Sequence, residues 1–273
     1  MAIDMYLDPK YAELIVEVNK LKIEVAEKIT ERDWLSTFIF PEIKHNYNLK
    51  LGANEAELYL AKLNLDKLKR KIVLYKENVK YDNTVDEEKL EKIIEKEFKN
   101  EIHEYTMMQE DIEHAIEYTH KEKFNSDLVN QLNYLYKNLI IKLSPLINFK
   151  NTRLENELYD ILEDAYKKCD YNKMLGIKAL CDTNHINSEL ELDDIDNMEK
   201  LKKVYMNLLE ENRCIVLNIR SSEMYSNRTI LNSEVLLRRK KDDINKKIAE
   251  ITEEYTKLLK EYEKLKKKKW GLQ

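Results

Sequence analysis

Residues that end helices are rare in this chain, and their scarcity constrains the fold more than any other feature. Three glycines and three prolines occur in 273 residues, too few for the tight turns of a β-rich fold. Along most of the chain, apolar residues recur at intervals of three and four, which places them on one face of a helix. We therefore predict an all-α fold of long amphipathic helices.

Residues 1–121 are predicted to form a helical hairpin with one extra helix. Pro9 suits the first turn of the extra helix, Pro41 is expected to kink or restart the next segment, and Gly52 to end it. Two amphipathic segments within residues 54–121 are separated by a short turn. Helices joined in this way are antiparallel neighbours, so we expect a hairpin with the first helix packed alongside it.

Residues 192–273 are predicted to form an autonomous antiparallel coiled-coil hairpin, preceded by a polar linker over residues 182–194. Its turn is expected between Ser221 and Ser233, where asparagines and serines cluster. Asn212 is the single polar residue in the first seam, and such a residue can fix the register of a helix pair. The seam residues of the two helices are Met198, Leu201, Tyr205, Leu208, Asn212, Ile215 and Ile219, then Leu237, Ile244, Ile248, Ile251, Tyr255, Leu258, Tyr262 and Leu265.

Residues 122–182, between these two regions, are predicted to form a helix pair. Pro145 cannot continue a helix and disfavours helical dihedral angles at Ser144, so the first helix should end there. The apolar stripe of the first helix is Leu128, Leu132, Leu135, Leu139 and Leu143, and that of the second is Leu154, Leu158, Ile161, Leu162 and Ala165. We expect the two stripes to face each other.

The central helix pair resembles a J-domain. The segment Leu135-Tyr136-Lys137-Asn138-Leu139, followed by Lys142-Leu143-Ser144-Pro145-Leu146, is similar to the second helix and loop of that family, and Tyr159-x-x-Leu162-x-x-Ala165-Tyr166 is similar to its third helix. The layout of the chain also resembles uncharacterised bacterial J-like proteins. The signature loop of the family is His-Pro-Asp, of which this chain keeps Pro145, with Ser144 at the histidine position and Leu146 at the aspartate position.

The resemblance implies a degenerate J-like fold and a candidate partner-binding loop. Its residues are Ser144, Pro145, Leu146, Ile147 and Phe149. An Hsp70 is the partner that the resemblance implies, but Ser144 and Leu146 cannot reproduce the charge-assisted contacts of the signature loop. We therefore expect no stimulation of Hsp70 ATP hydrolysis. The three apolar side chains after the proline, Leu146, Ile147 and Phe149, should be buried. Burial against the protein's own helices is favoured over burial in a partner.

The charge pattern argues against a general nucleic-acid binder, because the formal net charge is −5. The basic run Lys266, Lys267, Lys268 and Lys269, followed by Trp270, is an alternative site for phosphates or an anionic membrane surface. Such a run more often complements the dipole at a helix C-terminus and stays solvated. No glycine-rich phosphate loop is present in the sequence, so we expect no nucleotide cofactor.

The strongest metal candidate is a cluster of acidic residues and histidines within one predicted helix. The pairs Asp111/His114 and Glu117/His120 have the D/E-x-x-H spacing of dinuclear carboxylate sites, and Glu113 lies beside them. Those sites take ligands from several helices, so we interpret this cluster as a solvated charged face and expect no metal. No Ser-His-Asp or Cys-His arrangement is readable, so we predict no catalytic residues.

The cysteines, the N-terminal residues and the apolar runs of the sequence indicate a cellular compartment. Cys169, Cys181 and Cys214 are odd in number and lack C-x-x-C spacing, and the first residues show no signal-peptide pattern. The apolar run from Trp34 to Phe40 is too short to span a membrane. We therefore predict a cytoplasmic, non-enzymatic adaptor or scaffold that presents helical surfaces to protein partners.

Overall fold

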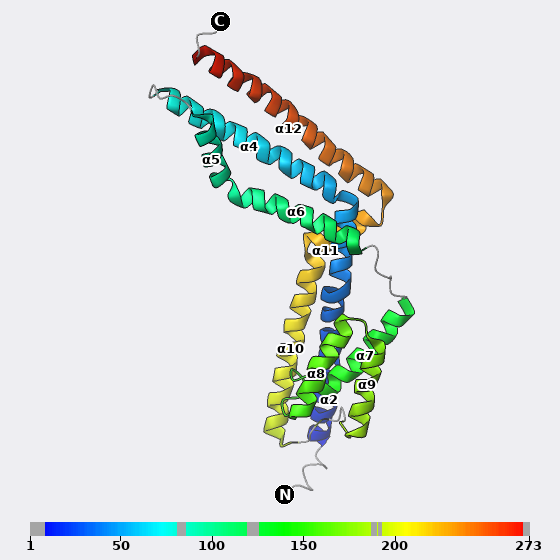
Figure 1. Cartoon of the computed structure of the whole chain (residues 1–273). Helices are drawn as coiled ribbons and strands as arrows, with labels where there is room; N and C mark the ends of the chain where they lie inside the picture. Colours follow the sequence, from blue (N-terminus) through cyan, green and yellow to red (C-terminus); the bar gives the residue numbers. More distant parts are fainter. Residues whose placement is uncertain (1–8, 81–85, 119–125, 187–189, 191–192, 270–273) are drawn as a thin grey trace. The chain divides into compact units, whose positions relative to one another are not determined.

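The computed structural model confirms the all-α fold, since every element in the described part of the chain is a helix (Figure 1). No helix in that part is long and apolar enough to cross a membrane. The residues that the structure does not describe are 1–8, 81–85, 119–125, 187–189, 191–192 and 270–273.

The chain folds into two compact units, and each unit combines two segments that are far apart in the sequence. Unit 1 contains residues 1–41 and 122–225, and unit 2 contains residues 42–121 and 226–273. The predicted division into three consecutive domains, 1–121, 122–182 and 192–273, is therefore wrong. Residues 1–121 contribute the long helix α2 (Pro9–Trp34) to unit 1 and α4 (Ala53–Lys80) to unit 2, and residues 192–273 contribute α10 (Ile195–Ser221) to unit 1 and α12 (Glu234–Lys269) to unit 2.

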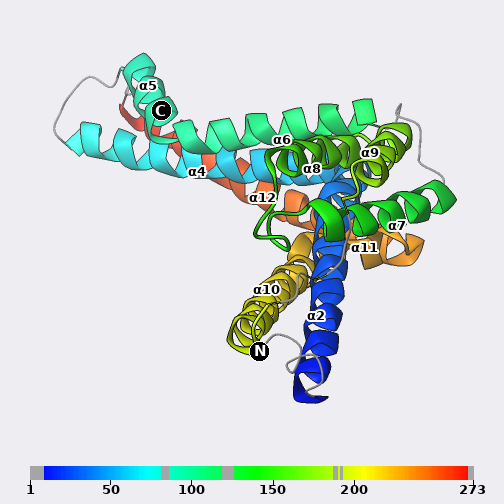
Figure 2. The same ribbon diagram turned by 90° about the horizontal axis from the view of Figure 1, so that it is seen from below.

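Unit 1 is a pair of long helices covered by three shorter ones. The long helices α2 and α10 pack along each other, α7 lies against α2, and α8 and α9 pack on α7 and on one another (Figures 1 and 2). These elements are α2 (Pro9–Trp34), α7 (Ser126–Leu143), α8 (Arg153–Lys167), α9 (Tyr171–Thr183) and α10 (Ile195–Ser221). α7 and α8 form the central helix pair that the sequence predicts.

Helices α2 and α10 run in the same direction. Three ion pairs join them in order along both helices: Glu17 with Lys202 at 2.7 Å, Glu24 with Arg213 at 3.8 Å, and Glu31 with Arg220 at 2.5 Å. Residue numbers rise together on the two sides, so the helices are parallel. Asn212 is buried in this contact, where its amide oxygen accepts a hydrogen bond from Arg32 at 3.0 Å.

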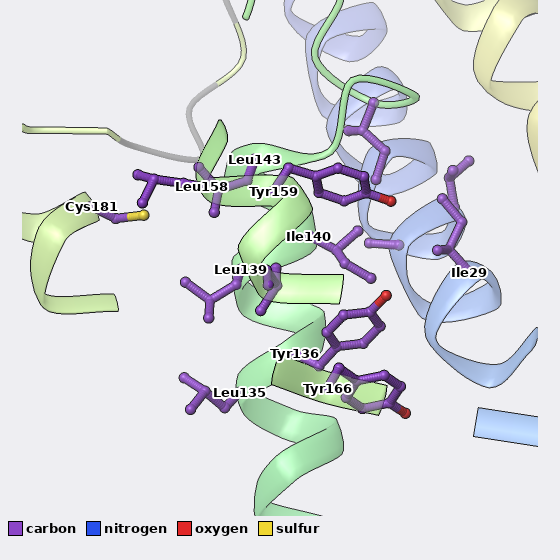
Figure 3. Close-up of a cluster of buried hydrophobic side chains, with 14 of the residues drawn as sticks. Ile29, Leu135, Tyr136, Leu139, Ile140, Leu143, Leu158, Tyr159, Tyr166 and Cys181 are labelled. Atoms are coloured by element: carbon purple, nitrogen blue, oxygen red, sulfur yellow. The ribbon is translucent and has the colours of Figure 1, made fainter. Parts of the chain in front are cut away.

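The core of unit 1 is one continuous cluster that surrounds α7. Figure 3 shows Leu135 and Leu139 on the side of α7 toward Cys181 of α9, and Tyr136 and Ile140 on the side toward α2. Tyr136 stacks on Tyr166 of α8 with ring centroids 3.7 Å apart. α7 is therefore buried on two faces, which explains why its sequence is the most apolar of the helices in this unit.

Unit 2 is built on a second parallel pair, α4 and α12. Lys240 pairs with Glu55 at 3.7 Å and Glu254 with Lys69 at 2.8 Å, so residue numbers again rise together. α5 and α6 return along α4 in the opposite direction, as the contact between Tyr59 and Glu104 indicates together with the Arg70–Glu97 ion pair. The bounds are α4 (Ala53–Lys80), α5 (Glu87–Glu97), α6 (Lys99–Tyr118) and α12 (Glu234–Lys269).

The predicted C-terminal hairpin is wrong. α10 packs on α2 in unit 1 and α12 packs on α4 in unit 2, with the short helix α11 (Glu223–Leu231) between them in sequence. The seam of α10 is also displaced in its C-terminal half, because Leu209 and Val216 are buried whereas Ile215 is exposed. The apolar stripe of one helix can pack against the apolar stripe of many other helices. The periodicity of the sequence therefore did not identify which helix packs on α10 or on α12.

Helical conformation also continues past Pro41 and Gly52, where a kink and an end are predicted. Two π-helical turns, η1 (Leu35–Ile39) and η2 (Asn48–Gly52), flank α3 (Phe40–Tyr47), and the first lies directly before Pro41, which has no N–H to donate. Gly52 has another role: a Cβ atom there would lie 2.8 Å from the Ile112 side chain of α6. The glycine therefore permits close helix packing rather than ending a helix.

Candidate partner-binding site

The loop between α7 and α8 is a compact, well-bonded turn. The carbonyl of Ser144 accepts hydrogen bonds from the N–H groups of Ile147 at 3.0 Å and Asn148 at 2.8 Å. The side-chain amide of Asn148 donates to Ile141 O at 3.0 Å. Thr152 then starts α8 with a capping box, in which Glu155 accepts the Thr152 N–H at 2.6 Å. These bonds hold the loop's side chains in defined directions.

The loop divides its side chains between the core and the solvent. Ser144 is fully buried and Ile147 is 1% exposed, whereas Pro145 is exposed, Leu146 is 40% exposed and Phe149 57% exposed. The predicted burial against the protein's own helices is therefore correct for Ile147 and wrong for Leu146 and Phe149, for which burial in a partner stays a prediction. The cause is the tight turn, because it directs Ser144 and Ile147 inward and leaves the intervening and following positions outside.

Two other predicted core positions also lie at the surface. Leu154 and Ile161 of the α8 stripe are 43% and 40% exposed, while Tyr159 and Tyr166 occupy the core in their place. The J-like motif residues Leu135, Leu139, Tyr159, Leu162 and Ala165 are all buried in unit 1. The spacing of these residues therefore places them in the contact between packed helices of unit 1.

Tyr205 of α10 fixes the loop from below. Its hydroxyl donates a hydrogen bond to Ile147 O at 2.8 Å, and its ring stacks on Phe149 with centroids 6.2 Å apart. Burial raises the pKa of Tyr205 to about 12, so the phenol stays protonated and remains a donor at any physiological pH. Tyr205 thus joins α10 to the loop, although the two are far apart in sequence.

A cavity of about 570 Å³ opens beside this loop, entirely within unit 1. Its apolar lining comes from the loop, α8, α10 and the segment that follows α9, with Ile147, Met198 and Tyr205 buried and Phe149 and Leu154 exposed. The volume lies within the range of about 300–1,000 Å³ that is typical of ligand pockets. The remaining apolar residues of the lining are Ile186, Leu190 and Leu201.

The polar lining of the cavity carries charges of both signs. Lys22, Lys142, Lys150 and His185 line it, and Lys22 is only 3% exposed although it lies in the middle of α2. Glu155 and Asp193 are the two carboxylates of the lining. Glu155 accepts a hydrogen bond from Thr152 N–H, and Asp193 accepts one from Asp194 N–H at 2.8 Å. The bond from Asp194 N–H is the main cause that lowers the pKa of Asp193, and the charge of Lys150 acts in the same direction. Lys142 pairs with Asp182 at 3.2 Å.

One wall of the cavity is formed by the C-terminal end of α9, which sequence reasoning assigned to a linker. His185 has a φ of 56°, and the N–H of Ile186 donates to Cys181 O at 2.9 Å. This is a Schellman motif, in which Asn184 is the C-cap. His185 occupies the position at which this motif usually has glycine, so the sequence carried no usual signal for it. Lys22 and Tyr205 carried no signal either, because only the fold brings α2 and α10 to the loop.

The other candidate sites do not assemble in the described residues. Asp111 is paired with Lys44 at 2.8 Å and His114 with Glu117 at 3.8 Å, while His120 lies outside the described residues. In the part of the chain that the structure describes, no group of three or more His, Cys, Asp or Glu residues is placed to hold a metal ion.

The basic C-terminal run is partly engaged within unit 2. Lys266 forms an ion pair with Glu87 and lies over the ring of Tyr262, with its Nζ atom 5.5 Å from the ring centroid. Lys267 is exposed, and the side chains of Lys268 and Lys269 lie outside the described residues. The run therefore serves helix packing at its first position, which leaves less of it for phosphates.

Comparisons of the chain with protein-family models, with curated proteins and with solved structures give no match. The candidate site consequently rests on its own geometry: an anchored loop, exposed apolar side chains and the cavity beside them.

Proposed function

We propose that this protein is a non-enzymatic adaptor whose unit 1 binds a protein partner at the loop between α7 and α8. One observation carries the proposal: Phe149 and Leu154 remain exposed at the wall of a cavity instead of joining the core. Exposed apolar side chains around a concave surface are characteristic of interaction sites. The long helix pairs of the two units supply the surfaces of a scaffold.

The chemistry of the cavity supports an adaptor over an enzyme. Among the residues that the structure describes, its lining contains one histidine and neither serine nor cysteine, and its threonine, Thr152, caps α8. Burial raises the pKa of the Cys169 and Cys181 thiols, which disfavours the reactive thiolate. All three cysteines are free thiols, in keeping with our proposal that the protein acts in the reducing cytosol.

Photo-crosslinking tests the proposal. Benzoylphenylalanine is placed at Phe149 in cells that produce the protein, and the same group is placed at Leu217 as a control. Leu217 is exposed on α10 but does not line the cavity. We expect a discrete crosslinked partner from position 149 and none from position 217. Equal labelling at both positions, or no crosslink at 149, contradicts the adaptor function at this loop.

The alternative function is that of a J-type co-chaperone, and the residues of the loop make a direct prediction about it. The Ser144 hydroxyl accepts the Leu146 N–H at 3.3 Å and lies in the core, and Leu146 presents no charge. We therefore expect single-turnover ATP hydrolysis by an Hsp70 to be unchanged at micromolar concentrations of this protein. A several-fold increase would establish the co-chaperone activity and replace the adaptor proposal.

A further inference from the structure

We propose that the cavity of unit 1 binds a neutral small molecule rich in hydroxyl groups, with a monosaccharide or disaccharide as the ligand class. This proposal goes beyond the adaptor function, because it concerns a compound inside the cavity and not a protein across the loop. Three observations at the same place carry it: a lining with charges of both signs, asparagine oxygens that accept no hydrogen bond from a described residue, and an exposed aromatic ring.

The charges of the lining do not favour a ligand of either sign. Lysines and carboxylates line the same space, and among them Lys142 already pairs with Asp182 at 3.2 Å. Glu155 and Asp193 keep their negative charge while they accept backbone N–H groups. A ligand without net charge avoids placing a second charge beside one of the same sign. A hydroxyl group suits both kinds of neighbour, because it donates one hydrogen bond and accepts others.

Three asparagines of the lining hold their amide nitrogens toward the backbone. The bonds run from Asn148 to Ile141 O at 3.0 Å, from Asn151 to Leu143 O at 2.5 Å and from Asn184 to Leu180 O at 2.8 Å. A carbonyl oxygen only accepts hydrogen bonds, so the amide atom beside it has to be the nitrogen, and the orientation of each amide is determined. Within the described part of the chain, the oxygens of these three amides accept no hydrogen bond.

Ordered acceptors of this kind favour a ligand that donates hydrogen bonds. The backbone bonds already fix the three amides, so binding immobilises little further side-chain freedom. A sugar carries hydroxyl donors around its ring, and the cavity of about 570 Å³ lies in the size range of small-molecule sites. A hydrocarbon ligand would displace water from the amide oxygens and give no donor in return, which costs free energy.

Phe149 provides an aromatic surface for a sugar ring. It is 57% exposed at the wall of the cavity, and its ring stacks on that of Tyr205 with the two planes 27° apart. The C–H groups of a sugar are polarised by the neighbouring oxygens, and the face of an aromatic ring is negative, so the two attract each other. An aliphatic side chain offers apolar area but no such ring. This difference separates sugar binding from a contact with an apolar side chain of a protein.

A glycan array and NMR spectroscopy provide the test. The full chain, labelled with a fluorophore at the exposed Cys214, is applied to an array of neutral glycans to identify a sugar that binds. Saturation-transfer difference NMR then compares the free sugar with toluene, benzoate and benzylamine, which are an apolar, a negative and a positive probe. We expect saturation transfer to the C–H groups of the sugar and a weaker signal from each of the other three probes.

Matched variants of the full chain locate the binding. Phe149→Leu removes the ring and Asn184→Ala removes an amide oxygen of the lining. Phe149→Tyr keeps the ring, and Asn207→Ala removes an exposed amide on α10 outside the cavity. We expect the Kd of the identified sugar, measured by calorimetry, to rise about fivefold or more for the first two variants and to stay within about twofold for the other two. Melting curves establish that all four variants fold.

The outcomes separate this proposal from the adaptor function. It is overturned when no sugar binds, when toluene, benzoate or benzylamine gives a stronger signal than every sugar, or when sugar binding is insensitive to both Phe149→Leu and Asn184→Ala. Equal losses for Phe149→Leu and Phe149→Tyr also overturn it, since the ring would then have no part in binding. A sugar that binds as expected while position 149 gives no crosslink supports the cavity ligand and contradicts the adaptor function.

Discussion

Unit 1 and unit 2 begin from the same element, a parallel pair of long helices, yet they differ in how they bury it. In unit 1 the pair α2–α10 is covered by α7, α8 and α9, and one continuous cluster of buried side chains results. In unit 2 the buried side chains form two smaller, separate clusters along the α4–α12 contact. In unit 1 the three shorter helices pack on the long pair and on one another, which gives a thick core, whereas in unit 2 α5 and α6 pack on α4 and leave a thin one.

The two units also form their cavities from different elements. In unit 1 the loop between α7 and α8 is anchored on α10 by the bond from Tyr205 to Ile147 O, and the cavity lies between this loop, the segment after α9 and α10. In unit 2 a smaller cavity, of about 280 Å³, is lined by the sides of α4 and α12 alone. The candidate site therefore belongs to the unit in which a loop contributes exposed side chains to the cavity.

The largest expected effect comes from removing a side chain at the centre of the unit 1 core. Leu139 of α7 is buried in the continuous cluster, where few neighbours can move to fill a void. We expect Leu139→Ala to lower the free energy of unfolding by about 4 kcal/mol. Urea unfolding measures the loss, and hydrogen exchange should show the loss of protection in unit 1. A cost near 1 kcal/mol would mean that the core is loosely packed.

A smaller effect is expected from the matching change in unit 2. Leu68 of α4 is also buried, but its cluster is small and bordered by partly exposed residues that can close over the vacancy. Leu68→Ala should lower the free energy of unfolding by about 2 kcal/mol. Val73→Ala, at an exposed position on the same helix, is the control. Equal costs for Leu68→Ala and Leu139→Ala would contradict the distinction between a thick and a thin core.

Sequence reasoning predicted which face of a helix is buried far better than which helix covers it. The stripe from Leu128 to Leu143 is buried or partly buried as predicted, because a period near 3.6 determines a face without reference to a partner. The partners of α10 and α12 were missed. Matching charges at Glu17, Glu24 and Glu31 carried the relevant information, but many other alignments of these long, charged helices give similar pairs.

The candidate site was predictable only in part, for a similar reason. Pro145 predicted the loop, and the apolar residues after it predicted a special environment, which the structure divides into a buried Ile147 and an exposed Phe149. Local sequence does not state which side chains of a tight turn point inward. Lys22 and Tyr205 reach the site from helices that no local pattern connects with the loop.

Within unit 1, the loop permits a comparison of a buried and an exposed apolar side chain two residues apart. Phe149 is more than half exposed, so Phe149→Ala should lower the free energy of unfolding by only about 1 kcal/mol. Ile147→Ala should cost about 3 kcal/mol, because Ile147 lies in the core. Thermal or urea unfolding of the two variants measures the difference. A larger cost for Phe149→Ala would show that this ring belongs to the core and not to a binding surface.

The smallest expected effect is a pH dependence of opposite sign in the two units. Burial raises the pKa of Asp33 in unit 1, although Arg32 and the Tyr136 hydroxyl oppose this shift, whereas a hydrogen bond from Arg70 lowers the pKa of Glu97 in unit 2. Asp33 therefore stabilises the fold below its unfolded pKa, near pH 4, and this contribution is lost as the pH rises through the folded value. Glu97 contributes above its unfolded pKa, and its contribution is lost as the pH falls.

The free energy of unfolding in urea, measured between about pH 3 and pH 7, covers the range in which Asp33 and Glu97 titrate in the unfolded chain. It distinguishes a stability that falls with pH from one that rises. As the pH rises, the parent should lose stability relative to Asp33→Asn and gain stability relative to Glu97→Gln. Only the change with pH is informative, because each substitution also adds an offset that does not depend on pH. A gain relative to both variants would mean that Arg32 outweighs burial at Asp33. The contact with Arg32 in unit 1 would then lower the pKa of Asp33, just as the exposed ion pair with Arg70 in unit 2 lowers the pKa of Glu97.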